Sequence, residues 1–180
     1  MTATVPIEQQ YLKTTLAAAA AFQTWVDAAD AAEAAERVHC FMLPEPEDPD
    51  PRNPDEYPRE QLEALRPFAL IFDPEDERER TEMVAVGTAA EFSRSGRLHV
   101  RFEQNAPDGI EGVHAETHQA FYEAIRDVLA GMDALPRGAG LYLAYTSHEI
   151  VTVPHWEKPE GKTGKGLSQV MVVSFDWGAG

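Results

Sequence analysis

The chain of 180 residues contains one cysteine, Cys40, and is poor in basic residues. A single cysteine excludes a disulfide within the chain and suits a reducing compartment. Only 15 lysine and arginine residues stand against 31 acidic residues, which gives a formal net charge of −16. Because this charge repels phosphate groups, we expect neither binding to nucleic acid through the overall field nor attachment to an anionic membrane.

Long apolar runs are also missing from the sequence. The alanine-rich run from Ala17 to Phe22 is much shorter than the roughly 20 residues needed to span a bilayer. The first residues lack a basic segment followed by an apolar core, so we expect no signal peptide and synthesis in the cytoplasm. The length and the 43% hydrophobic content suit one domain over residues 1–180 that buries a core without disulfides.

The N-terminal part of the sequence predicts two helices and a strand. Pro6 suits a first helical turn, and apolar residues then recur at helical spacing up to Val26. The alanine-rich segment "DAADAAEAAERV" predicts a second helix, and Asp30 with Glu33 is spaced like a capping box. The short apolar run "VHCFMLP" that follows predicts a strand.

The remainder of the sequence predicts several strands and one long helix. We expect strands in "RPFALIFDP", in "MVAVGTAAEF" and in "SGRLHVRFEQ", with a turn at Ser95-Gly96. An apolar stripe predicts a helix from about Ile110 to Leu135. "LYLAYTSHEIVTVPHW" predicts a strand, or two with a kink near Ser147, and "QVMVVSFDWG" a final strand. The predicted fold class is α+β, with a mainly antiparallel sheet packed against the long helix and with N-terminal helices.

The segment from Pro44 to Pro58 predicts a surface loop. Its six prolines and interleaved acidic residues fit neither a helix nor a central strand. Its acidic side chains could suggest calcium, but the segment lacks the glycine and the closing glutamate of an EF-hand loop. We therefore predict no calcium site there.

The segment "GKTGKG" resembles a phosphate-binding loop only superficially. Gly161 and Gly166 have the required glycine spacing, but Leu167 occupies the position of the essential lysine. A strand rather than a helix is predicted to follow. We therefore expect a glycine-lysine hairpin loop over residues 157–168 between the last two strands. Because it holds three of the few basic residues, this loop is a candidate contact with an acidic partner: Lys158, Lys162 and Lys165.

No other motif specifies catalysis, and we predict no catalytic, cofactor-binding or metal-binding residue. His114 and His118 are four residues apart in "HAETH" and could share a metal, but Ala115 stands where a zinc protease has glutamate, and no third ligand is evident. We interpret this stretch as a solvated helix face. Cys40 lies in the apolar run "HCFML", where cysteine is usually a small buried hydrophobe. No serine lies in a G-x-S-x-G turn.

Taken together, the order of elements resembles that of tail terminator, or tail completion, proteins from tailed phages, prophages and gene-transfer particles. Most of the chain carries the resemblance: "AFQTWVDAADAAEAAERVH", "RPFALIF", "SGRLHVRFE", "HQAFYEAIRDVLAGM" and "QVMVVSFDWG". The loop from Pro44 to Pro58 departs from it, since it is longer than the compact core of the family needs. The resemblance rests on element order and pattern, and not on a diagnostic motif.

The resemblance implies a non-enzymatic virion protein without cofactors. It implies a homo-oligomer, a six-fold ring at the head-proximal end of the tail tube, that stops tube polymerisation and joins the tube to the head-tail connector. Its partners are then the tube protein and the connector or stopper protein, its place is the tail or neck of the virion, and it is made in the bacterial cytoplasm.

Three alternatives remain open at this stage. A head-tail stopper or another neck protein is of the same class as a terminator. A small acidic cytoplasmic adaptor or immunity-like protein also fits, because acidic proteins often neutralise basic partners. A metal-dependent enzyme using His114 and His118 comes last.

Overall fold

The computed structural model describes residues 6–47, 58–74, 80–86, 89–106, 114–134, 143–157 and 168–179. Five helices and six strands occur in these residues. In chain order they are α1 (Ile7–Ala18), α2 (Ala20–Trp25), α3 (Ala31–Glu36), β1 (Val38–Cys40), α4 (Arg59–Leu65), β2 (Phe68–Phe72), β3 (Arg80–Val86), β4 (Ala89–Asn105), α5 (His114–Asp133), β5 (Leu143–Glu157) and β6 (Ser168–Ala179).

The six strands form one sheet in which only one pair is parallel. The order across the sheet is β1-β2-β4-β6-β5, and β3 pairs with β4 outside this path. β1 and β2 run parallel, while every other pair is antiparallel. The predicted α+β class with a mainly antiparallel sheet is therefore confirmed. No helix in the described part of the chain is long and apolar enough to cross a membrane.

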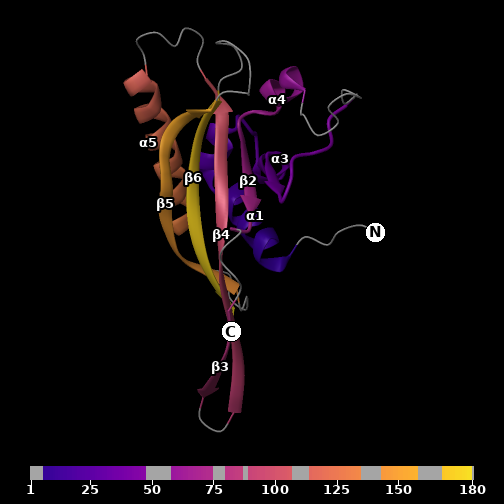
Figure 1. Cartoon of the computed structure of the whole chain (residues 1–180), viewed down its shortest axis with the longest axis vertical. Helices are drawn as coiled ribbons and strands as arrows, with labels where there is room; N and C mark the ends of the chain where they lie inside the picture. Colours follow the sequence, from indigo (N-terminus) through magenta and orange to yellow (C-terminus); the bar gives the residue numbers. More distant parts are fainter. Residues whose placement is uncertain are drawn as a thin grey trace.

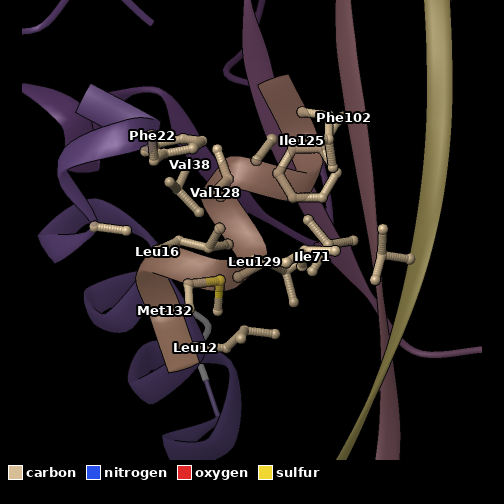
Figure 2. Close-up of a cluster of buried hydrophobic side chains, with 14 of the residues drawn as sticks. Leu12, Leu16, Phe22, Val38, Ile71, Phe102, Ile125, Val128, Leu129 and Met132 are labelled. Carbon is tan, nitrogen blue, oxygen red and sulfur yellow. The ribbon is translucent and has the colours of Figure 1, made fainter. Parts of the chain in front are cut away.

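One face of the sheet packs against helices to form the hydrophobic core. Alternate residues of the central strand β4 (Leu98, Val100 and Phe102) point into this core, as do Met171, Val173 and Phe175 of β6. Figure 2 shows part of the cluster, in which α5 contributes Ile125, Val128, Leu129 and Met132 and the N-terminal helices contribute Leu12, Leu16 and Phe22. The sheet is thus covered by α1, α2 and α5 together.

The predicted long helix is α5, the longest helix of the described residues at 20 residues. Its apolar stripe is buried at Phe121, Ile125, Val128 and Met132, and the buried Leu129 widens the stripe. The predicted ends, Ile110 and Leu135, lie outside the described residues.

The first helix differs from its prediction because it breaks at Ala19. This residue is extended, with φ −72° and ψ 118°, and separates α1 from α2. The Gln23 side chain donates a hydrogen bond of 2.9 Å to the Ala17 carbonyl, which would otherwise lack a partner at the end of α1. Leu16 before the break and Phe22 after it are both fully buried. The break therefore lets both side chains pack into the same core.

The turn predicted at Ser95-Gly96 is wrong. β4 runs without interruption from Ala89 to Asn105 and pairs with β6 on both sides of Gly96. A Cβ atom at Gly96 would lie 2.8 Å from Nε1 of Trp177 on β6, so glycine here gives room to an indole. The resulting long strand extends past the other strands, and residues 89–93 of β4 pair only with β3 among the described strands. Figure 1 shows this β3–β4 ribbon projecting beyond the rest of the chain.

The final two strands form the predicted antiparallel pair. Glu157 is paired with Ser168, so the chain between them closes a hairpin. β5 is one strand, and its register shifts between Tyr145 and Ser147, so the irregularity near Ser147 is a shift of pairing within that strand. Of the predicted loop from Pro44 to Pro58, residues 48–57 lie outside the described residues, and residues 44–47 are neither helix nor strand. The short helix α4 that follows was not predicted.

Candidate functional site

The sheet face opposite the core carries a row of charged and polar residues along β4. Because alternate residues of a strand point to opposite faces, Arg97, His99, Arg101 and Glu103 lie on this outer face. β6 contributes Val172, Ser174 and Asp176 to it, and β2 contributes Leu70 and Phe72.

A buried ion cluster occupies one end of the outer face. Glu103 is 4% exposed and accepts from two arginines: Arg66 Nη2 lies 2.6 Å from its Oε1, and Arg101 Nη2 lies 2.8 Å from its Oε2. Arg66 is 8% exposed, and its Nη1 also donates to Asn105 Oδ1 at 3.2 Å. Charged hydrogen bonds of this kind position groups firmly. The cluster therefore fixes the segment before β2 against β4.

A second ion pair lies at the opposite end of the face and is half exposed. Arg97 Nε donates to Asp176 Oδ1 at 2.7 Å, and Ser147 Oγ donates to Asp176 Oδ2 at 2.7 Å. The hydrogen bond from Arg97 is the main reason that the pKa of Asp176 is held below its usual range. An ionised carboxylate with two donors is a structural contact and not a proton donor.

Between the two ion clusters, a serine lies in register with a histidine and a glutamate. Ser174 of β6 pairs with His99 of β4 on one side and with Glu149 of β5 on the other. A hydrolase triad needs the histidine between the serine and the acid, so that one ring nitrogen takes the serine proton. Here the serine is in the middle. This row therefore does not support nucleophilic catalysis.

A chain of polar side chains crosses the core at the end of the sheet, and the sequence did not predict it. Trp25 Nε1 donates to Gln104 Oε1 at 3.0 Å, and Gln104 Nε2 donates to Gln169 Oε1 at 2.6 Å. Gln169 Nε2 lies 3.3 Å from His118 Nδ1. These four residues join α2, β4, β6 and α5, and Gln169 is completely buried. The only available signal was the polar pair Gln104 and Gln169 beside apolar strand runs.

Of the two histidines of "HAETH", the structure describes the side chain of His118 only. His114 is the first residue of α5, and nothing is described of its side chain. His118 is half-buried and contacts the Gln169 amide, which corrects the interpretation of a solvated helix face at that position. In the part of the chain that the structure describes, no group of three or more His, Cys, Asp or Glu residues could hold a metal ion.

Cys40 and His39 lie side by side on β1. Burial raises the pKa of the Cys40 thiol, and so disfavours the reactive thiolate. The pKa of His39 falls from 6.5 to about 4, first because of burial and then because of Lys13 and Arg37. Its Nε2 is buried and has no hydrogen-bond partner among the described residues. Both side chains are held in uncharged forms at neutral pH.

The predicted interaction loop cannot be placed. Lys158, Lys162 and Lys165 all lie outside the described residues. The flanking residues Glu157 and Ser168 are paired at the ends of β5 and β6, so the loop begins and ends at one end of the sheet. Its role as a contact element stays a prediction.

Exposed apolar side chains gather at the two edges of the sheet. Val151 and Val153 on β5 are 50% and 69% exposed. Phe41 and Met42, which follow β1 at the other edge, are 45% and 71% exposed. The remaining large apolar residue exposed in the described chain is Ile7 on α1. Apolar side chains exposed at strand edges are typical of contact surfaces.

Comparisons with known proteins do not assign the chain to a family. Neither the protein-family models nor the curated protein sequences that were searched match the chain.

Proposed function

We propose that this protein is a non-enzymatic structural subunit of a phage-like tail: a tail terminator that assembles into a ring at the head-proximal end of the tube. The observation that carries the proposal is the shape of the sheet. It has an edge with exposed apolar residues on each side, and the β3–β4 ribbon projects from one end (Figure 1).

This shape suits a ring subunit for a geometric reason. A ring subunit needs two different lateral surfaces, one for each neighbour, and a further surface along the ring axis for the component stacked on it. The two sheet edges are candidates for the lateral contacts, and the ribbon is a candidate for the axial contact. A two-stranded ribbon is marginal by itself in water, so docking against a partner would stabilise it.

The described outer face supports a non-enzymatic role. Its charged residues are paired with one another in the Arg66–Glu103–Arg101 and Arg97–Asp176 clusters, and its serine and histidine are arranged unsuitably for a triad. The charge of −16 would also disfavour adhesion of DNA to a channel wall built from such subunits.

The acidic helix surfaces favour a second candidate, an adaptor or immunity-like protein that covers a basic partner. Four acidic residues are exposed along α5: Glu116, Glu123, Asp127 and Asp133. Such a surface would attract a basic protein and speed its association. A head-tail stopper would share the ring but would close the channel instead of ending the tube.

Removal of the gene from particle-producing cells separates these functions. If the protein is a terminator, its removal should give tails of uncontrolled length, seen by electron microscopy as tubes much longer than those of the parent particles. A stopper predicts tails of normal length on heads that leak DNA. Particles with normal tails and full heads would contradict both, and would favour the adaptor.

A further inference from the structure

We infer that the chain of polar side chains formed by Trp25, Gln104, Gln169 and His118 makes the packing of α5 on the sheet depend on the charge of His118. The chain joins four elements, and its last hydrogen bond forms only while the imidazole is neutral. The inference does not depend on the proposed ring, because all four residues lie in one copy of the protein.

The indole of Trp25 fixes the direction of every hydrogen bond in the polar chain. An indole N–H can only donate, so the atom of Gln104 that faces it at 3.0 Å must be the carbonyl oxygen, Oε1. The Nε2 of the same amide then donates to Oε1 of Gln169 at 2.6 Å. Gln169 therefore has only its own Nε2 left to face His118. Neither glutamine can turn its amide over without bringing two donors together.

His118 must therefore accept at the end of the polar chain. Its Nδ1 lies 3.3 Å from Nε2 of Gln169, and a ring nitrogen accepts only when it carries no proton. The polar chain is complete with a neutral imidazole protonated on Nε2, and it is broken in the charged form, in which both ring nitrogens carry protons. Because Gln169 is completely buried, its amide would then lose this partner without access to water.

The break would act on α5 at the end of the sheet that carries the predicted interaction loop. His118 is the fifth residue of α5, so its release would loosen the first turns of that helix. Gln169 is the second residue of β6 and directly follows Ser168, where the hairpin loop ends. A proton taken up by His118 would thus change the packing beside the loop.

The described carboxylates on the elements of the polar chain are engaged or placed elsewhere. Glu103 precedes Gln104 on β4 but lies on the outer face, in the buried ion cluster. On α5, Glu116 is exposed and two residues from His118, a spacing at which residues of a helix do not face each other. Helix α2 contains no charged residue, and the two neighbours of Gln169 on β6 are uncharged.

Other titratable residues lie on the same elements. Tyr122, one turn after His118, is half-buried, and the Arg126 guanidinium lies 5.9 Å from the centre of its ring. His114 lies one turn before, and on β5 His155 and Glu157 stand on either side of the position that pairs with the buried glutamine of β6. These residues are the same in the parent and in both variants of the test, so they do not account for a difference between the proteins.

The test compares three full-length chains at about pH 7.5 and about pH 5.5, on either side of the ordinary histidine pKa of about 6.5. His118→Asn keeps a neutral acceptor near the position of Nδ1 at both pH values. Trp25→Phe keeps an aromatic ring in the core but removes the N–H, so both glutamine amides can turn over and accept from a charged His118.

The unfolded chain takes up the proton on His118 without this loss, so acidification should favour unfolding of the parent. Urea unfolding should show that the ratio of folded to unfolded parent falls by about tenfold more than that of His118→Asn, with Trp25→Phe in between. Hydrogen exchange at the lower pH should show lost protection in the first turns of α5 in the parent, and not in His118→Asn.

Equal losses in the parent and His118→Asn, or equal protection of α5 in both, would overturn the inference. Equal losses in the parent and Trp25→Phe would overturn it too, because the indole would then not set the direction. One measurement needs no substitution. Nitrogen NMR shifts of the parent at the higher pH should show His118 with its proton on Nε2, and a proton on Nδ1 would contradict the inference.

Discussion

The indole of Trp177 lies where a side chain at residue 96 would have to stand. A Cβ atom at Gly96 would approach three atoms of that indole to within 2.8–2.9 Å, whereas one at Gly131 of α5 would meet Ala19 at an ordinary 3.6 Å. The two glycines therefore predict opposite responses to the same substitution.

Gly96→Ala should destabilise the protein by about 1–3 kcal/mol, because a buried indole must move to admit the methyl group. Gly131→Ala should instead stabilise it by about 0.5–1 kcal/mol, because alanine favours the helix and its methyl group would meet Ala19 and Ala21 at ordinary van der Waals distances. Urea unfolding followed by circular dichroism measures both free energies. Equal stabilities for Gly96→Ala and the parent would contradict the account of this site.

The depressed pKa of His39 predicts a specific dependence of stability on pH. The pKa is 6.5 when unfolded and about 4 when folded, so the unfolded state binds more protons in this range. The contribution of neutral His39 is therefore complete above pH 6.5 and is lost as the pH falls towards 4.

His39→Phe removes this titration while keeping a ring beside Phe68, whose centroid lies 5.8 Å from that of His39. The free energy of unfolding of the variant, relative to the parent, should rise as the pH is lowered from about 7 to about 4.5, because only the parent must protonate His39. A difference that stays constant over this range would show that the histidine is not shielded as the structure indicates.

At the scale of elements, the ion cluster at the start of β2 joins parts of the chain that are far apart in sequence. Glu103 on β4 forms a salt bridge with Arg66, which lies between α4 and β2. Removing the negative charge leaves a guanidinium that is 4% exposed without its counterion.

Glu103→Gln should therefore cost about 3–5 kcal/mol. The matched double variant, Arg66→Met with Glu103→Leu, should recover most of this loss because both buried charges are gone, while Arg101, at 28% side-chain exposure, can be hydrated. Thermal or urea unfolding of the three proteins tests the pair. A double variant as unstable as Glu103→Gln would mean that the cost lies in packing and not in the unpaired charge.

Elements with a strong period were predictable from the sequence, and elements shaped by distant neighbours were not. The apolar stripe of α5 and the alternation at Leu98, Val100 and Phe102 are local patterns, and the residues that form them are buried in the core. Nothing in the sequence distinguishes Ala19 from the neighbouring alanines. The helix breaks there because Leu16 before it and Phe22 after it both pack into the core. Gly96 has the sequence pattern of a turn residue, but it is a glycine because the indole of Trp177, 81 positions later, packs directly against it.

The polar network shows the same limit for the candidate site. Trp25, Gln104, Gln169 and His118 come from four elements, and no spacing in the sequence joins them. Cys40, which the sequence predicts to be a small buried hydrophobe, is only partly buried. The sequence could not reveal that exposed Val151 and Val153 lie at one edge of the sheet and Phe41 with Met42 at the other, because that requires the strand order.

At the scale of the whole molecule, net charge opposes any assembly of identical copies. Each copy carries −16, so neighbours in a ring repel one another beyond their local contact. Salt screens this long-range repulsion, and it does not weaken apolar contacts at the sheet edges.

Self-association should therefore strengthen when the salt concentration rises from about 10 mM to about 100 mM, as the Debye length falls from about 30 Å to about 10 Å. Light scattering at constant protein concentration measures the change in mean mass. Association that weakens steadily with salt would mean that local charge attraction, and not apolar contact, holds the copies together.

The most direct test of the proposed function is the growth of tail tubes in vitro. Purified tube protein of the same particle would be polymerised with and without a small molar share of this chain, and tube lengths measured by electron microscopy. A tail terminator should give shorter tubes that carry a ring of this protein at one end. Tubes of unchanged length, with no added density at either end, would contradict the terminator function.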